Sequence, residues 1–300
     1  MPADLLDLDD LLTSWVRALK GEHKSPHTVS SYRGTVMAFR DFCADTGRPA
    51  ELNRDNVIAF MAAHAGQVST ARLRLTVLKL FAKWVAAEED FDAAGVLSVR
   101  APRADDPTVP DLTDTQIARL LKACEGQTLL DKRDRALVAL FVETGLRAAE
   151  MAALDITDID VDTCQLHVRR GNGGKGRRVR FSAATGAVVD RYLRHRRRAV
   201  LAPAGGPLWI ATRTGARIGY RGLAVALAAR ADKAGIEGFH LHRLRHSAAT
   251  RWLRAGGTET GLKAHAGWTS NRMIERYTRA VSDQLAAEEF DRLDLGVVEL

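Results

Sequence analysis

Residues 239–256, FHLHRLRHSAATRWLRAG, concentrate three histidines and four arginines in one short amphipathic segment. We interpret the segment as a helix. Three kinds of chemistry fit such a cluster of cations and imidazoles: a metal site, a nucleic-acid-binding stripe, or an active site that handles phosphate. The remainder of the sequence decides among them.

Composition favours a large protein with a polyanionic partner. The chain has 300 residues and is 46% hydrophobic, which supports a sizeable core and two domains. Lysine and arginine number 44 against 37 acidic residues, a formal net charge of +7. A net positive charge of this size favours a protein that binds nucleic acid. The alternative is a soluble enzyme that happens to be basic.

The cysteines and the N-terminus indicate where the protein works. Cys43, Cys124 and Cys164 are odd in number, far apart and outside any CxxC pair, so we expect a reducing compartment. The first residues are acidic where a signal peptide needs positive charge, and no apolar run reaches membrane-spanning length. The sequence therefore predicts a soluble, cytoplasmic protein.

The first part of the chain, residues 1–97, is predicted to be an all-helical domain. One helix starts at Ser25-Pro26 and ends before Gly47. A second helix near 69–87 has an apolar side made of Leu73, Val77, Leu80, Phe81 and Trp84. Another stripe of that helix carries Arg72, Lys79 and Lys83, which either face DNA or form a solvated surface.

A proline-containing stretch of mixed charge at 98–112 is predicted to be an interdomain linker, and 113–300 a second domain. The second domain opens with a capping box at Thr113 and Gln116. A helix near 131–144 ends at Gly145, and β-prone runs at 164–169 and 177–181 flank a glycine-rich turn. A basic helix follows at 184–200, then a strand-like run at 208–211 and helices to about residue 290. The fold class is therefore mainly α with a small β-sheet.

Two metal sites are considered and rejected. His242 and His246 share a helix face as zinc ligands would, but Arg243 stands where a zinc-protease motif needs glutamate. A magnesium-dependent phosphodiesterase could use the acidic run at 155–162, whose spacing matches a calcium loop at three positions. Thr163, however, replaces the required glycine, and Arg169 replaces the closing glutamate. The run is better explained as a polar connection between a helix and a strand. We predict no metal and no cofactor.

Phosphate chemistry without a metal fits the histidine segment best. His242 and Arg245 are three residues apart, so their side chains project together from a helix. A guanidinium binds two phosphate oxygens through paired hydrogen bonds, and an imidazole transfers a proton near neutral pH. The segment still lacks a nucleophile, a second cation and an acid for the leaving group.

Four motifs supply what is missing, and in this order they resemble the tyrosine recombinases, the lambda-integrase and Xer-like family. They are TGLRAAE at 144–150, GKG at 174–176, HRLRH at 242–246 and AGWTSNRMIERYTRA at 266–280. The resemblance spans nearly the whole chain. It implies a SAM-like helical core-binding domain followed by an α+β tyrosine-recombinase catalytic domain.

The resemblance also assigns roles to individual residues. Arg147 and Arg245 bind the phosphate, Lys175 is the lysine of the β-hairpin, and Tyr277 is the nucleophile. His242 assists proton transfer, while Glu150 and His246 support the site. Trp268 stands where most relatives carry histidine, and it either donates a hydrogen bond to phosphate or only packs, because an indole cannot shuttle a proton.

The implied activity is site-specific recombination of double-stranded DNA through a 3′-phosphotyrosyl intermediate, independent of metal and ATP. The alternatives are a non-cutting DNA-binding protein on the same scaffold, and a type IB topoisomerase-like or telomere-resolving strand transferase. The resemblance further implies dimers and a tetramer on DNA, with the C-terminal tail exchanged between protomers. The candidate DNA-binding residues are Arg72, Lys79, Lys83, Arg169, Arg170, Arg177 and Arg178.

Overall fold

The computed structural model describes residues 7–64, 68–102, 111–169, 176–199 and 205–268, with short pieces at 274, 286–287 and 289–293. The chain divides into two compact units, Met1–Pro107 and Thr108–Leu300. No helix among the described residues is long and apolar enough to cross a membrane.

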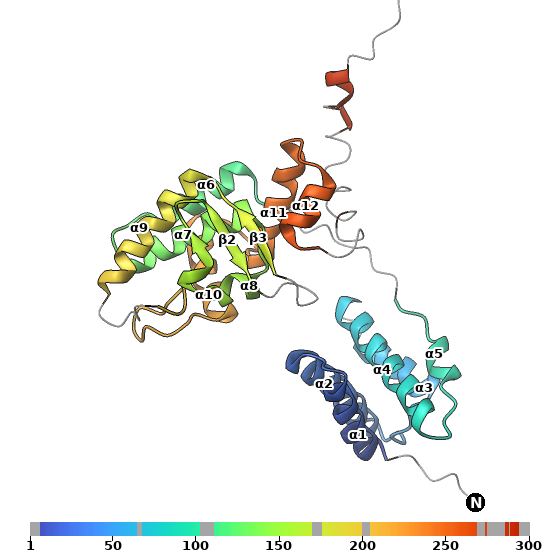
Figure 1. Cartoon of the computed structure of the whole chain (residues 1–300). Helices are drawn as coiled ribbons and strands as arrows, with labels where there is room; N and C mark the ends of the chain where they lie inside the picture. Colours follow the sequence, from blue (N-terminus) through green and yellow to red (C-terminus); the bar gives the residue numbers. More distant parts are fainter. Residues whose placement is uncertain are drawn as a thin grey trace, which may run out of the picture. The chain divides into compact units, whose positions relative to one another are not determined.

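Helices alone make up the described part of the N-terminal unit (Figure 1). They are α1 (Leu8–Gly21), α2 (Pro26–Asp45), α3 (Arg54–Ala63), α4 (Val68–Glu88) and α5 (Ala94–Ser98). The side chain of Ser25 caps α2, and Pro26 occupies its first turn, as the sequence predicts. Aromatic rings pack against one another in the core of this unit. The ring centroids of Trp15 and Phe81 lie 5.0 Å apart, and Phe39 meets Phe60 edge-on with centroids 5.5 Å apart.

The predicted apolar side of α4 is partly wrong. Leu73 and Leu80 were expected inside, but 49% and 40% of their surface is exposed. The buried stripe instead includes Leu75, Leu78 and Val85, together with the correctly predicted Val77 and Phe81. Apolar residues occur around most of this helix, so their spacing does not define a single face.

The C-terminal unit combines helices with a small sheet (Figure 1). Its helices are α6 (Asp114–Ala123), α7 (Leu129–Thr144), α8 (Ala148–Ala153), α9 (Ala183–Arg198), α10 (Tyr220–Lys233), α11 (Leu241–Arg254) and α12 (Glu259–Ala266). After α8 come the 3-10 turn η1 (Ile156–Asp158) and strands β1 (Ile159–Asp160), β2 (Gln165–Val168) and β3 (Arg177–Arg180). The strands form an antiparallel sheet in the order β1-β2-β3, with Val168 opposite Arg177. The predicted fold class is confirmed.

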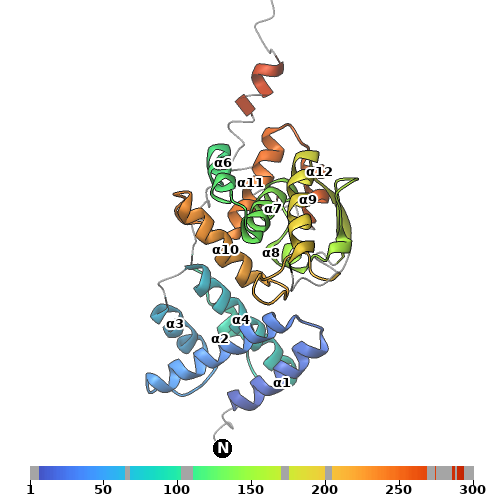
Figure 2. The ribbon, with the colours of Figure 1, turned by 90° about the vertical axis from the view of Figure 1, so that its left-hand side faces the viewer.

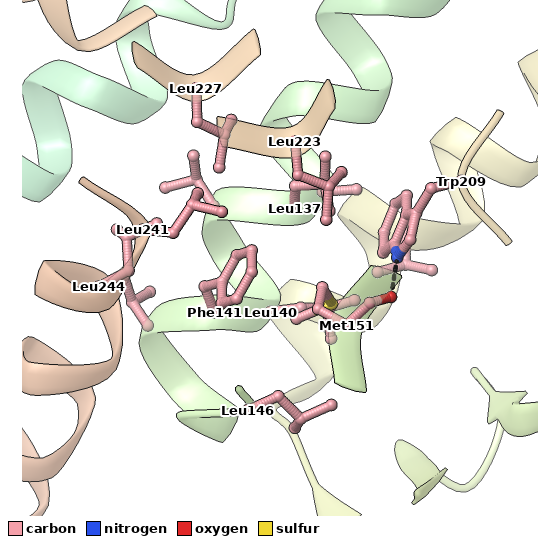
Figure 3. Packing of buried hydrophobic residues seen from close by; sticks show 14 of the residues in the cluster. Leu137, Leu140, Phe141, Leu146, Met151, Trp209, Leu223, Leu227, Leu241 and Leu244 are labelled. Carbon is pink, nitrogen blue, oxygen red and sulfur yellow. Dashed lines mark hydrogen bonds between the residues drawn. The ribbon is translucent and has the colours of Figure 1, made fainter. Parts of the chain in front are cut away.

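Helix α7 forms the centre of this unit. Leu137, Leu140 and Phe141 are fully buried, and α9 and α11 pack alongside the helix (Figure 2). Figure 3 shows leucines of α10, leucines of α11 and Met151 of α8 packing around the α7 side chains from different sides. This packing fixes the C-terminal end of α7, the N-terminal end of α8 and helix α11 relative to one another.

The strand-like run at 208–211 is not a strand. Within the run, Ile210 forms an isolated bridge with Arg217, and the preceding Pro207 forms another with Asp155. Trp209 and its neighbours are nevertheless buried, which explains their strand-like composition.

Candidate active site

Arg147 is the N-cap residue just before α8 and follows a left-handed turn. Gly145, with φ 57°, ends α7, and the fully buried Leu146 anchors the turn. The backbone N–H of Arg147 donates to Glu150 Oε2 at 2.9 Å, and Nη1 donates to Glu150 Oε1 at 3.1 Å. Its Nη1 and Nη2 also donate to the carbonyl of Gly267, each at 3.3 Å. With 31% of its side chain exposed, Arg147 remains accessible to a ligand.

Arg245 reaches the same place from α11. Only 3% of the residue is exposed. Its guanidinium donates to the carbonyl of Gly145 and, at 3.1 Å, to the carbonyl of Ala266. Arg147 and Arg245 therefore bind consecutive carbonyls, those of residues 267 and 266, at the C-terminal end of α12. Both cations also suit the negative end of that helix's dipole.

Glu150 is the acidic member of this cluster. Burial by itself would raise the pKa of Glu150, but hydrogen bonds from the Arg177 side chain and the Arg147 amide, with the charges of both arginines, bring it below its usual range. Glu150 therefore stays ionised and neutralises part of the positive charge around it.

The histidines of α11 lie beside Arg245. His242 is exposed and meets the buried His246 edge-on, with ring centroids 4.5 Å apart. His242 is thus placed to reach a ligand, whereas His246 belongs to the interior. Among the described residues, no three histidine, cysteine or acidic side chains gather as a set of metal ligands.

Trp268 directly follows the Gly267 cap of α12 and is only 4% exposed. It packs in a cluster with Ala249, Leu253 and Leu262. The Arg245 guanidinium lies over its ring, 5.3 Å from the centroid. Of the two roles considered for Trp268, this geometry favours packing, because the ring supports the face of the Arg245 guanidinium.

Three predicted site residues, Lys175, Tyr277 and Arg170, lie outside the described residues. Among the candidate DNA contacts, Arg72, Lys83 and Arg178 are exposed. Lys79 is half-buried and donates to the carbonyl of Leu97 at 2.7 Å. These residues remain predictions.

Two other candidate DNA contacts have protein partners. Arg169 is half exposed and pairs with Asp155 and Asp158, so the acidic run at 155–162 serves as the polar connection expected for it. Arg177 binds Glu150 and the carbonyl of His265, and 12% of its side chain is exposed. This contact set argues against the DNA role that the sequence suggested for Arg177.

Arg147 and Arg245, from separate parts of a mainly helical scaffold, meet at the C-terminal end of α12, and a pair of guanidinium groups is the kind of site that suits a phosphodiester. Residues 110–283 match the phage integrase family, and residues 11–90 match the phage integrase N-terminal SAM-like domain. The chain belongs to the phage integrase family.

Individual relatives agree with this assignment. The tyrosine recombinase XerC of Chromobacterium violaceum is 30% identical over 294 residues, covering 95% of this chain and 94% of the relative. Among solved structures, the XerH site-specific recombinase bound to a palindromic difH substrate superposes with TM-score 0.73 at 16% identity, covering 93% of this chain and 83% of that one. The lambda integrase tetramer bound to a Holliday junction gives a TM-score of 0.72 at 16% identity, covering 91% of this chain and 78% of that one. These two structures share the fold.

Proposed function

We propose that this protein is a site-specific DNA recombinase that cuts and rejoins DNA through a 3′-phosphotyrosyl link on Tyr277. The observation that carries the proposal is the pair Arg147 and Arg245, both bound at the C-terminal end of α12. Neither the non-cutting alternative nor the topoisomerase-like one is favoured, because the relatives are recombinases over nearly their full length.

Each residue contributes one part of the reaction. The Tyr277 oxygen attacks the phosphorus while the bond to the 5′-oxygen breaks, so the energy of the phosphodiester is kept in the covalent intermediate and no ATP is needed. Arg147 and Arg245 stabilise the charge that grows on the non-bridging oxygens, a task that metal ions perform in many nucleases. Lys175 protonates the departing 5′-oxygen, and His242 removes or returns a proton.

The decisive experiment detects the covalent intermediate between the protein and DNA. A nicked duplex is built on a DNA segment that the protein protects from nuclease digestion, so that cleavage releases a short fragment and traps the adduct. In EDTA, wild-type protein is expected to give an adduct that survives denaturing electrophoresis, whereas Tyr277→Phe gives none because the nucleophilic oxygen is gone.

Tyr32→Phe is the matched control. Tyr32 stacks on Trp15 in the N-terminal unit, with centroids 5.7 Å apart, so losing its hydroxyl should leave the adduct unchanged. An adduct that persists in Tyr277→Phe would assign the nucleophile elsewhere. No adduct from the wild type would favour the non-cutting alternative.

We further propose that protomers assemble on the DNA site as dimers and a tetramer, and that the tail is exchanged between them. Residues 289–293 are helical, and Phe290 and Leu293 expose 59% and 53% of their surface. Three residues apart, they form one apolar face suited to a groove on a neighbouring protomer. A tail folded back on its own protomer is the alternative. With DNA as its substrate, such an enzyme works in the cytoplasm of a bacterium or of a phage-infected host.

Truncation after residue 282 tests the tail. The shortened protein is expected to bind a single half-site normally but to lose cooperative binding to a full site, because the contact between protomers is gone. Gel-shift titration of half and full sites measures both quantities, and Glu289→Gln in the full-length chain serves as a control that keeps the apolar face. If the truncated protein fills the full site as cooperatively as the wild type, the tail does not join protomers.

A further inference from the structure

Arg177 uses all three guanidinium nitrogens on protein partners. Nη1 and Nη2 donate to Glu150 Oε1 and Oε2 at 3.0 and 2.9 Å, and Nε donates to the carbonyl of His265 at 3.1 Å. Paired hydrogen bonds between a guanidinium and a carboxylate fix both direction and distance. Arg177 therefore connects the first residue of β3 to α8 and to α12.

Gly267 makes a second contact with the same guanidinium. A Cβ atom added to Gly267 would lie 2.7 Å from Cζ of Arg177, and the residue has φ +66°. The left-handed backbone favours glycine here, and any side chain at this position would displace the Arg177 guanidinium. Gly267 also supplies the carbonyl that Arg147 binds. Arg177 contacts both residues that hold the Arg147 side chain.

The charges of this cluster depend on Arg177. Arg147 and Arg177 share the Glu150 carboxylate, so two positive groups and one negative group leave one net positive charge. Without Arg177, Glu150 would pair with Arg147 alone and cancel its charge. A neutral pair stabilises the negative charge that grows on the phosphate in the transition state far less than a free guanidinium does.

We propose that Arg177 is a positioning residue of the recombination reaction, acting through Glu150 to keep Arg147 oriented and positively charged toward the DNA phosphate. The inference rests on the proposed function above. Because Arg177 is paired with Val168 at the end of the β2–β3 ladder, the same contacts attach this end of the sheet to α8.

The test separates positioning from DNA binding and from general stability. Arg177→Met, Glu150→Gln and the double variant are compared for single-turnover adduct formation, DNA affinity at several salt concentrations and thermal unfolding. We expect Arg177→Met to slow adduct formation on the order of 100-fold, as for a misplaced catalytic group, with affinity and its salt dependence unchanged. The double variant is expected to recover to within about tenfold of the wild type, because removing the carboxylate restores the charge of Arg147.

Arg180→Met is the matched control, since Arg180 lies on the same strand with its side chain exposed and should leave the rate unchanged. If Arg177→Met does not fold, Arg177→Lys replaces it. Lysine keeps the charge but loses the bidentate hydrogen bond to Glu150, so adduct formation is expected to slow by about tenfold.

Two results would overturn the inference. A fall in affinity with a salt slope reduced by about one would make Arg177 a DNA phosphate contact. Equal loss of rate in the single and double variants would leave it a merely structural residue. A wild type that forms no adduct overturns the proposed function as well, whereas a wild type that cuts no faster than Arg177→Met overturns this inference alone.

Discussion

Replacing Arg245 by lysine is expected to slow covalent adduct formation by about 10²- to 10³-fold, the usual loss when one donor to a developing negative charge is removed. Arg245 is 3% exposed and bridges the carbonyls of Gly145 and Ala266. A lysine keeps the charge, but its single nitrogen cannot hold both carbonyls and present a planar pair of donors to a phosphate. Single-turnover cleavage of the nicked duplex measures the effect.

Arg243→Lys is the control for this substitution. Arg243 lies on the same helix and is 6% exposed, and its Nη1 donates at 2.7 Å to the carbonyl of Glu237, a residue that precedes α11 and is not part of α12. Both lysine variants lose bonds to backbone carbonyls in the interior, so their unfolding midpoints should fall by similar amounts. Only Arg245→Lys should lose its cleavage rate. If both variants cleaved equally slowly, the loss of cleavage rate would be explained by lower stability of the fold.

The sequence motifs identified the two candidate phosphate-binding arginines, but not the cluster of side chains around them. Arg147 and Arg245 stand in recognisable motifs, whereas Arg177 is one of several arginines on a short strand. Strand alternation was the available signal. Val179 is buried and points inward, so Arg177, two residues earlier, shares its face, while Arg178 and Arg180 face solvent. The ion pair between Arg177 and Glu150 could not be predicted, because the two residues are distant in sequence.

Helix ends were predicted more reliably than helix faces. Side-chain caps such as Ser25 and Thr113 act within three residues, so sequence alone reveals them. Which side of α4 is buried depends on neighbours that come from elsewhere in the chain. The strand prediction for 208–211 was wrong for a related reason. The run is apolar and buried, but its backbone forms hydrogen bonds with residues such as Leu154 and Ala216 instead of with a strand.

Trp209→Ala is expected to destabilise the C-terminal unit by about 3–5 kcal/mol, the usual cost of removing a large aromatic side chain from a core. Trp209 is fully buried and stacks on Tyr192 at 5.3 Å (Figure 3 shows its place in the core). Its indole N–H donates to the carbonyl of Met151 at 2.9 Å. Urea unfolding followed by circular dichroism measures the change, and adduct formation should fall with it, since Met151 belongs to the helix that presents Arg147.

Trp209→Phe separates the two contributions. A phenyl ring refills much of the volume but lacks the N–H, and the Met151 carbonyl keeps a second donor, the amide of Leu154 at 3.3 Å. The lost hydrogen bond should therefore cost about 1 kcal/mol, and the larger part of the alanine effect should come from the cavity. If Trp209→Phe were as damaging as Trp209→Ala, the hydrogen bond to α8 and not the packing would hold this helix in place. The phenylalanine variant would then lose adduct formation as severely as the alanine variant.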